Sequence, residues 1–189
     1  MTPEIYVIKV NTPIDENTFQ FLLSFVSDEK KERILRNRIQ QNADNMLIGE
    51  ILARFMIKKT FGVSVEEQSF CLDKHGKPFL AEHPDIHFNI SHSGEYVACG
   101  VSNRPIGIDI QKIGLYKPDL AQKVCTENEL AGIESTSNKA SEFTRLWTQK
   151  EAVLKMNGTG IRGDIKNCLE NFNVDSKKID EYWLSVWCP

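Results

Sequence analysis

The sequence lacks the features that define several whole classes of proteins. Its 189 residues contain no apolar run near the ~20 residues that span a bilayer, so we expect no membrane-spanning helix. Residues Met1–Glu4 lack the basic and apolar regions that open a secretory signal peptide. The five cysteines are dispersed without a C-x-x-C pair, and only four histidines accompany them. A disulfide framework or a zinc site is therefore not expected, and we predict a cytoplasmic protein.

An excess of positive charge is also missing. The chain has 23 lysine and arginine residues against 26 aspartate and glutamate residues, a formal net charge of −3. Bulk binding of nucleic acid usually requires a basic face, so this balance argues against a nucleic-acid partner. Neither a Walker loop nor a G-x-G-x-x-G sequence is present. Any bound phosphate would therefore have to be held by side chains and turns.

The order of the predicted elements is similar in the two halves of the chain. Hydrophobic periodicity and turn residues in the first half predict a strand at 6–10, helices at 15–26, from 27 and at 43–60, and strands at 86–90 and 95–101. The second half follows with a strand at 106–111, helices at 119–124, 127–133 and 139–156, and strands at 168–174 and 182–186. Gly158 and Gly160 are predicted to end the last helix. We therefore predict two related lobes, joined near residues 102–105.

The predicted strand at 106–111 carries a first candidate site. Alternate side chains point to opposite faces of a strand, so its three isoleucines would face the core while Gly107, Asp109 and Gln111 share the other face. Asp109 and Gln111 would lie ~7 Å apart, a spacing that presents two oxygen ligands to a cation such as Mg²⁺. The polar solvent face of an edge strand would produce the same pattern. Gly107 favours the ligand interpretation, because glycine inside a strand often marks close approach by a ligand.

The helix predicted at 139–156 carries a second candidate site. Lys150 falls in the middle of its apolar stripe, where a lysine would either extend to solvent or line a polar cleft. Glu151 lies at the margin of the stripe, and Lys155 follows one turn later on the same side. The simpler interpretation is a surface ion pair worth a few tenths of a kcal/mol. The functional interpretation is a carboxylate and an ammonium that face a cleft.

A third candidate is the polar segment Asn89–Gly94, at the end of a predicted strand. Its hydroxyls, the His92 imidazole and the free backbone N–H groups of a turn would suit an anion such as phosphate, although an ordinary polar turn would look the same. A Ser-His-Asp hydrolase is not expected, because no G-x-S-x-G sequence is present. Five basic residues are dispersed along the chain: Lys30, Arg33, Arg36, Lys77 and Lys155. They would suit binding of an anionic small molecule, or they would simply form solvated helix faces.

Three segments together resemble one enzyme family. Asn89–Ser93, Ile106–Asp109 and Trp147–Ala152, with Lys155 one turn later, have the order and spacing seen in the Sfp-type 4′-phosphopantetheinyl transferases. The likeness extends back through Lys30, Arg33 and the segments 48–50 and 75–78. The resemblance implies an α+β fold of two similar lobes with a pseudo-twofold relation, each a small, mostly antiparallel sheet packed with helices. The lobes would be residues 1–103 and 104–189, with coenzyme A in the cleft between them.

The resemblance also implies a reaction and roles for particular residues. The phosphopantetheine arm of coenzyme A would move to a serine of an apo acyl or peptidyl carrier protein, with release of adenosine 3′,5′-bisphosphate. The implied ligands of Mg²⁺, or of Mn²⁺, are Asp109 and Glu151, with Gln111 as a weak ligand or one that acts through water. The implied coenzyme A ligands are Lys30, Arg33, Lys77, Ser91, His92 and Lys155. The implied catalytic residues are Glu151, Lys155 and Glu129, with Glu151 the first candidate for the proton acceptor and Glu129 the second.

Two other functions are compatible with the same residues. One is a different Mg²⁺-dependent phosphohydrolase or phosphotransferase that uses Asp109 and Glu151. The other is a non-catalytic coenzyme A-binding module, whose metal site was lost because Gln111 stands where many relatives have a glutamate. We expect a monomer, and the sequence leaves open whether the carrier serves fatty-acid, polyketide or peptide synthesis.

Overall fold

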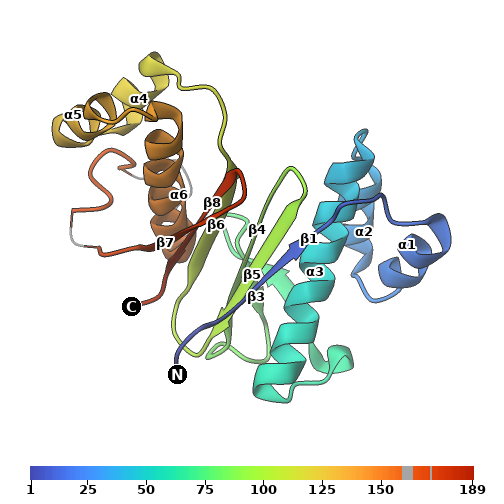
Figure 1. The fold of residues 1–189 in the computed structure, drawn as a ribbon. Helices are drawn as coiled ribbons and strands as arrows, with labels where there is room; N and C mark the ends of the chain where they lie inside the picture. The colour runs from blue at the N-terminus through green and yellow to red at the C-terminus, as the bar shows by residue number, and fades with distance from the viewer. Residues whose placement is uncertain (159–163, 171) are drawn as a thin grey trace.

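The computed structural model describes residues 1–158, 164–170 and 172–189 and contains two antiparallel three-stranded sheets (Figure 1). The sheet of the N-terminal lobe has the order β1 (Glu4–Lys9), β5 (Tyr96–Ser102), β4 (His87–Ser93). The sheet of the C-terminal lobe has the order β6 (Gly107–Lys112), β8 (Tyr182–Trp187), β7 (Asp175–Ile179). In each lobe the first strand pairs with the last strand of a hairpin. This shared topology confirms the predicted α+β fold of two similar lobes.

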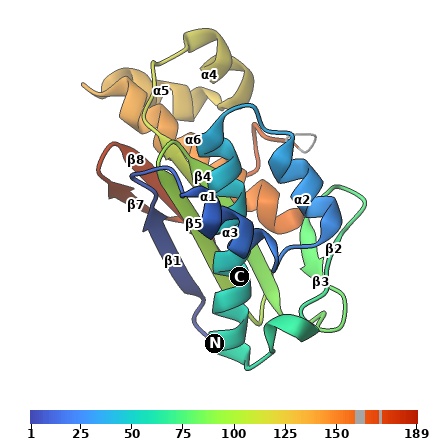
Figure 2. The same ribbon diagram turned by 90° about the vertical axis from the view of Figure 1, so that its right-hand side faces the viewer.

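Each sheet is packed against one long helix. In the N-terminal lobe this helix is α3 (Gln40–Phe61), with α1 (Glu16–Leu23) and α2 (Asp28–Leu35) beside it (Figure 2). In the C-terminal lobe it is α6 (Lys139–Asn157), preceded by α4 (Pro118–Val124) and α5 (Glu127–Ser135). The smaller elements are the 3₁₀ turn η1 (Val65–Glu67) and the hairpin of β2 (Phe70–Leu72) and β3 (Pro78–Leu80). Within the described ranges no helix is long and apolar enough to cross a membrane.

Capping residues explain where several helices begin and end. Ser27 accepts a hydrogen bond from the backbone N–H of Lys30 and caps the start of α2, the helix predicted from residue 27. Gly62 and Gly158 end α3 and α6 with φ angles of 77° and 70°, a left-handed conformation that favours glycine. Gly160, the second predicted stop for α6, lies outside the described residues.

The strand predicted at 168–174 is wrong. The backbone forms turns up to residue 170, and the strand β7 begins only at Asp175. The turns begin at Asp164, whose side chain accepts hydrogen bonds from the backbone N–H groups of Lys166 and Asn167. This pattern is typical of a turn that starts at an aspartate. The strand β7 has the sequence DSKKI. Aspartate and lysine have low β-propensity, so a prediction based on propensity does not find this strand.

Side chains of β4 join the two sheets. Asn89, Ser91 and Ser93 of β4 each accept a hydrogen bond from the backbone of β6, so the two strands are connected without a backbone ladder. The three bonds run from Ile108 N to Asn89 Oδ1 (2.9 Å), from Ile110 N to Ser91 Oγ (3.1 Å) and from Lys112 N to Ser93 Oγ (3.1 Å). We call this row the lobe junction. The alternation of side chains in a strand makes it possible, because residues two apart share one face.

Residues 107–110 of β6 are buried on both faces, so the alternative of a polar solvent face does not hold for Gly107 and Asp109. The isoleucines of β6 face the core, and Gly107 and Asp109 are also buried. A Cβ atom on Gly107 would lie only 1.9 Å from the backbone oxygen of Ala152 in α6. Gly107 therefore marks the close approach of a helix to the strand, not the close approach of a ligand as predicted.

Candidate active site

Asp109, Glu151 and Lys155 meet where α6 crosses β6. Lys155 Nζ lies 2.6 Å from Asp109 Oδ1, and the Ser91 hydroxyl donates to the same oxygen at 2.8 Å. Lys155 also donates to Ser91 Oγ at 3.0 Å. The functional interpretation of the α6 residues is therefore favoured over a surface pair between Glu151 and Lys155, since the lysine pairs with Asp109 on the neighbouring strand.

Two carboxylate oxygens of this cluster are buried without a hydrogen-bond partner in the described part of the chain: Asp109 Oδ2 and Glu151 Oε1. Burial raises the pKa of Glu151, the negative charge of Asp109 raises it further, and Lys155 partly opposes both effects. A buried carboxylate without a partner is unfavourable, whereas carboxylate oxygens are the ligands that Mg²⁺ prefers. The donor set therefore fits a hard divalent cation.

The rest of a metal coordination shell would have to come from groups other than further carboxylates of the described residues. Among the residues that the structure describes, no three histidine, cysteine, aspartate or glutamate side chains are grouped so that they could hold a metal ion together. Gln111 lies two residues beyond Asp109 on β6 and is half-buried. Its amide oxygen, water or a phosphate of a substrate would complete such a shell.

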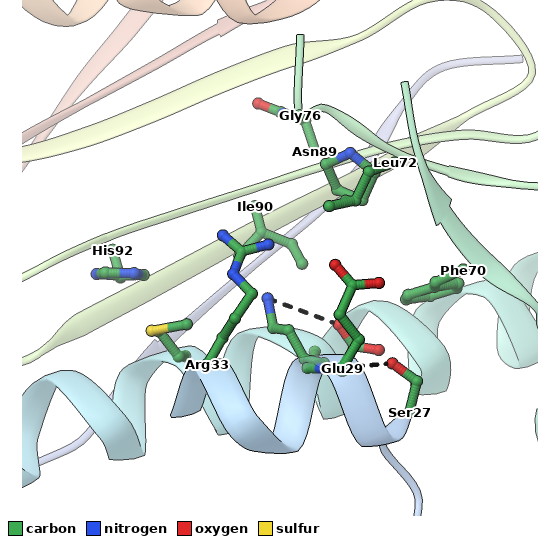
Figure 3. Close-up of a pocket in the computed structure, with 13 residues that line it drawn as sticks. Ser27, Glu29, Arg33, Phe70, Leu72, Gly76, Asn89, Ile90 and His92 are labelled. Carbon is green, nitrogen blue, oxygen red and sulfur yellow. Dashed lines mark hydrogen bonds and ion pairs between the residues drawn. The ribbon is translucent and has the colours of Figure 1, made fainter. Parts of the chain in front are cut away.

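A cavity of about 310 Å³ lies between α2 and β4 (Figure 3). Figure 3 shows Arg33 extending from α2 toward Ile90 of β4, with His92 on one side and Phe70 on the other. Lys30, Arg33 and His92 bring positive or protonatable groups to this cavity, and apolar side chains form much of its remaining wall: Met46, Phe70, Leu72, Pro78 and Ile90. Cations beside an apolar wall suit a ligand that combines a phosphate with a planar base.

Charges of both signs line this cavity, because Glu29 and Glu50 stand beside Lys30 and Arg33. Burial lowers the pKa of Lys30 despite its ion pair with Glu50, where Nζ and Oε2 lie 3.9 Å apart, and Arg33 lowers it further. Burial also lowers the pKa of His92, and the positive charges of Lys155 and Lys30 add to this effect. A bound phosphate would stabilise the protonated form of each of these groups.

A second cavity of about 210 Å³ connects the first one to Lys155. The two cavities share part of their walls, namely Gly76, Pro78, Asn89 and Ile90. Lys77 lines the second cavity, and its Nζ donates to the carbonyl oxygens of Met156 in α6 (2.9 Å) and of Ile106, just before β6 (3.4 Å). A lysine has three donors, so one remains for a ligand. Lys30, Arg33, Lys77 and Lys155 thus line one groove formed by the two adjoining cavities. Arg36 does not, since it lies on the exposed face of α2 and pairs with Glu32 at 2.8 Å.

Ser91 is the predicted phosphate ligand that the structure places elsewhere. Neighbouring residues of a strand point to opposite faces, so His92 lines the first cavity while Ser91 faces β6. The hydroxyl of Ser91 contacts Asp109, Lys155 and the backbone of Ile110. The structure therefore places His92 at the first cavity and Ser91 at the Asp109 cluster, and the role of each toward a phosphate stays a prediction.

The contacts of Glu129 lie away from the Asp109 cluster, with Thr126 and Lys150. It forms a capping box with Thr126 at the start of α5, and its Oε1 lies 3.0 Å from Lys150 Nζ. Lys150 is completely buried and also donates to the backbone oxygens of Ile165 (3.1 Å) and Lys166 (2.8 Å). We expected Lys150 either to extend to solvent or to line a polar cleft, and the structure shows neither. Its side chain holds α5 and the 165–166 turn against α6.

Some residues of the site were not predicted from the sequence. Glu50 of α3 pairs with both Lys30 and Arg54, and Phe70 and Leu72 of β2 line the first cavity. The three polar residues of the lobe junction do have a signal, because Asn89, Ser91 and Ser93 alternate with period two. Glu50 lies in the segment 48–50 that shares the family resemblance, but no role was predicted for it, since a carboxylate in an amphipathic helix usually faces water.

Comparison with known proteins supports a single family for the whole chain. Residues 12–104 match the family described as 4′-phosphopantetheinyl transferase, N-terminal, and residues 105–188 match the 4′-phosphopantetheinyl transferase superfamily. The chain is 38% identical over 160 residues to 4′-phosphopantetheinyl transferase gsp of Aneurinibacillus migulanus. The aligned residues make up 84% of this chain and 67% of that protein. It is 32% identical over 188 residues to a 4′-phosphopantetheinyl transferase of Bacillus subtilis, with 98% of this chain and 81% of that protein covered. Identity to 4′-phosphopantetheinyl transferase Sfp of Bacillus subtilis (strain 168) is 31% over 160 residues, or 84% of this chain and 71% of that protein. On these matches, and with the site geometry in agreement, the chain belongs to the 4′-phosphopantetheinyl transferase superfamily.

Proposed function

We propose that this chain moves the phosphopantetheine arm of coenzyme A to a serine hydroxyl of an apo carrier protein and releases adenosine 3′,5′-bisphosphate. Transfer to a carrier protein is the activity of the superfamily, and our proposal assigns it to particular residues. The observation that carries the assignment is the pair of partnerless oxygens, on Asp109 and Glu151, beside Lys155 at the end of a groove lined with cations.

Asp109 and Glu151 would hold Mg²⁺, or Mn²⁺ in its place, with Gln111 as a neutral ligand or one that acts through water. When bound, this ion supplies positive charge to the pyrophosphate of coenzyme A. Lys155 would supply further positive charge to the same group. Reactions at phosphorus depend on such charge neutralisation and on positioning more than on covalent help from the protein.

Coenzyme A would lie along the groove with its adenosine end in the first cavity. Lys30, Arg33 and His92 would bind the 3′-phosphate, and the apolar wall that includes Phe70 and Leu72 would accept the adenine. The pyrophosphate would then reach the second cavity, where Lys77 and Lys155 are available.

The transfer step needs an acceptor for the proton of the carrier serine. Its hydroxyl oxygen would attack the phosphorus that carries the pantetheine arm, and the bond to the 5′-phosphate of the bisphosphate would break. Glu151, whose pKa is raised by burial, would accept the hydroxyl proton directly or through a water molecule. Lys155 would stabilise the charge that develops on the leaving phosphate. Glu129 remains a less favoured candidate for the proton acceptor, since Lys150 holds its carboxylate.

One experiment separates this function from the two alternatives. The protein is incubated with coenzyme A, Mg²⁺ and an apo carrier protein, and the carrier is weighed by mass spectrometry. Transfer adds ~340 Da, the mass of the phosphopantetheine group moved at phosphorus, and a carrier whose acceptor serine is replaced by alanine gains nothing. Breakdown of coenzyme A without a carrier would indicate a phosphohydrolase. Binding of coenzyme A without any turnover would indicate a binding module.

We further propose that the protein acts in the cytoplasm and as a monomer. Its five cysteines are free thiols, which suits a reducing compartment. Light scattering coupled to gel filtration would test the oligomeric state, and a mass twice the 21.6 kDa of the chain would contradict it.

His92 should make coenzyme A binding depend on pH. Burial and nearby lysines hold the pKa of free His92 below its usual value, and a bound phosphate should raise it. Protons are then taken up on binding, so affinity for adenosine 3′,5′-bisphosphate should increase as the pH falls toward the pKa of free His92. Calorimetry in buffers of different ionisation enthalpy measures this uptake. Some of the protons taken up come from titration of the phosphate itself. Replacement of His92 by glutamine should leave that part and remove the protons bound by His92.

Gln111→Glu should strengthen binding of Mg²⁺ to the free protein by roughly tenfold, because a third carboxylate adds a charged ligand. With two carboxylates, the wild type should bind Mg²⁺ weakly until coenzyme A adds its phosphate oxygens, so metal and coenzyme A should each raise affinity for the other. Calorimetric titration of Mg²⁺ with and without coenzyme A measures this coupling. Gln111→Ala is the matched control and should change activity little, because water replaces a neutral ligand. Equal metal affinity in the two wild-type titrations would contradict this account.

A further inference from the structure

We propose that Thr148 of α6 and Ser185 of β8 are positioning residues, whose hydrogen bond sets the distance between Asp109 and Glu151 at which a divalent cation binds. Neither residue is proposed to contact the metal or the substrate, and no role was predicted for either. This inference rests on the metal site of the proposed function.

Three hydroxyls form a chain between α6 and the C-terminal sheet. Thr148 Oγ1 lies 2.7 Å from Ser185 Oγ, which lies 2.9 Å from Ser176 Oγ of β7. Thr148 and Ser185 are completely buried. A hydroxyl carries one hydrogen, and that of Thr148 bonds to the backbone oxygen of Arg145 at 2.9 Å. Ser185 therefore donates to Thr148 and Ser176 donates to Ser185, so the chain has one direction and ends on the helix backbone.

This chain of hydroxyls meets the sheet beside Asp109. Ser185 is the residue of β8 directly opposite Asp109 of β6 in the antiparallel pairing, so the two side chains project from the same face of the sheet. Thr148 precedes Glu151 by three residues in α6, and residues three apart lie on the same side of a helix. The hydrogen bond thus joins the cross-strand neighbour of one carboxylate to the helical neighbour of the other.

A second contact fixes α6 on the other side of Glu151. A Cβ atom on Gly107, two residues before Asp109, would lie 1.9 Å from the backbone oxygen of Ala152, the residue that follows Glu151. The helix is therefore fixed to β6 just after Glu151 and to β8 one turn before it. Lys155 also reaches Asp109, but through a flexible four-carbon chain that does not fix the helix itself. The bond between Thr148 and Ser185 is directional, so it opposes small shifts of Glu151 relative to Asp109.

The helix α6 offers two matched controls. Ser141 is also bonded to β8, where its Oγ accepts from Trp183 Nε1 at 2.9 Å, but it lies ten residues before Glu151. Thr144 is buried one turn before Thr148, and its hydroxyl donates within the helix, to the backbone oxygen of Ala140 at 2.8 Å. Ser141→Ala removes a distant bond between helix and sheet, and Thr144→Val removes a buried hydroxyl without a bond to the sheet.

The test measures Mn²⁺ binding to the free protein from the electron paramagnetic resonance of unbound Mn²⁺. Thr148→Val keeps the shape of the side chain without its hydroxyl, and Ser185→Ala removes the other partner. Each should lower Mn²⁺ affinity by about fivefold, the size expected when one ordinary hydrogen bond is lost. The double variant should lose no more than either single variant, because both remove the same bond. Thr148→Ser keeps the hydroxyl and should bind Mn²⁺ like the wild type.

A second measurement separates a local effect on the metal site from damage to the whole protein. Binding of adenosine 3′,5′-bisphosphate in the presence of EDTA, followed by calorimetry, should be unchanged in every variant, because Lys30 and Arg33 belong to the other lobe. Ser141→Ala and Thr144→Val should keep the Mn²⁺ affinity of the wild type.

Three results would overturn the proposal. The first is Mn²⁺ affinity like that of the wild type in Thr148→Val or Ser185→Ala, and the second is an additive loss in the double variant. The third is an equal loss in Ser141→Ala, which would assign the effect to general docking of α6. If Thr148→Val does not fold, the comparison of Ser185→Ala with Ser141→Ala still decides. A wild type that binds no Mn²⁺ would overturn this inference together with the metal site, whereas failure to modify a carrier would contradict the proposed function alone.

Discussion

Asp109→Asn and Glu151→Gln should each lower the rate of carrier modification by about 10³-fold, the size of loss expected when a group that stabilises charge in the transition state is removed. Both carboxylates lie at the crossing of β6 and α6, and each has a buried oxygen without a partner in the described residues. The amide variants keep shape and hydrogen bonding while they remove the charge that would hold Mg²⁺. The measurement is formation of modified carrier at saturating Mg²⁺ and coenzyme A.

Stability distinguishes loss of chemistry from loss of fold in these variants. Glu151 is partly buried, and the unfavourable burial of its charge raises its pKa. Glu151→Gln removes that charge, so in EDTA at neutral pH the variant should be at least as stable as the wild type to denaturant. A variant that is inactive but no less stable would locate Glu151 in the site. Transfer near the wild-type rate in either amide variant would remove that residue from the metal site.

Lys150→Met should lower the free energy of unfolding by about 3–5 kcal/mol, the usual loss when one partner of a buried ion pair is removed. Lys150 is fully buried and binds three acceptors, the carboxylate of Glu129 and the backbone oxygens of Ile165 and Lys166. Methionine fills a similar volume but leaves all three acceptors without this donor. Denaturant unfolding followed by circular dichroism measures the loss.

The control variants separate the charge effect from other effects. Glu129→Gln combined with Lys150→Met removes both charges and should be more stable than Lys150→Met alone. Lys155→Met, in the same helix but with a side chain 28% exposed, should cost less stability. If Lys150→Met kept its stability and lost transfer, Lys150 would belong to the catalytic groups instead of the structural contacts between α5 and α6.

The local periodicity of the sequence predicted most of the elements that position the site. The helix predicted at 43–60 is α3 (Gln40–Phe61), and the helix predicted at 139–156 is α6 (Lys139–Asn157). Their amphipathic patterns and glycine ends are local signals, so they are readable without any tertiary information. The structure also brings Asp109, Glu151 and Lys155 together, as the family resemblance implied by joining segments that are far apart in the chain, while their roles stay predictions.

Contacts between distant segments account for what the sequence left undetermined. Alternation along β6 predicted that Gly107 and Asp109 share a face, yet nothing local reveals that α6 covers that face. The partners of Lys150 come from α5 and the 165–166 turn, so its burial depends on the packing of three segments.

The neighbouring residues Ser91 and His92 show most clearly what the sequence determines and what the packing of the two sheets determines. Strand geometry requires that they point to opposite faces, and this much follows from the sequence. Which of the two faces meets the cavity and which meets β6 depends on how the two sheets come together. Local sequence therefore determined the elements and the residue types at the site, whereas the packing of the two lobes determined which polar side chains face a ligand and which hold the others in place.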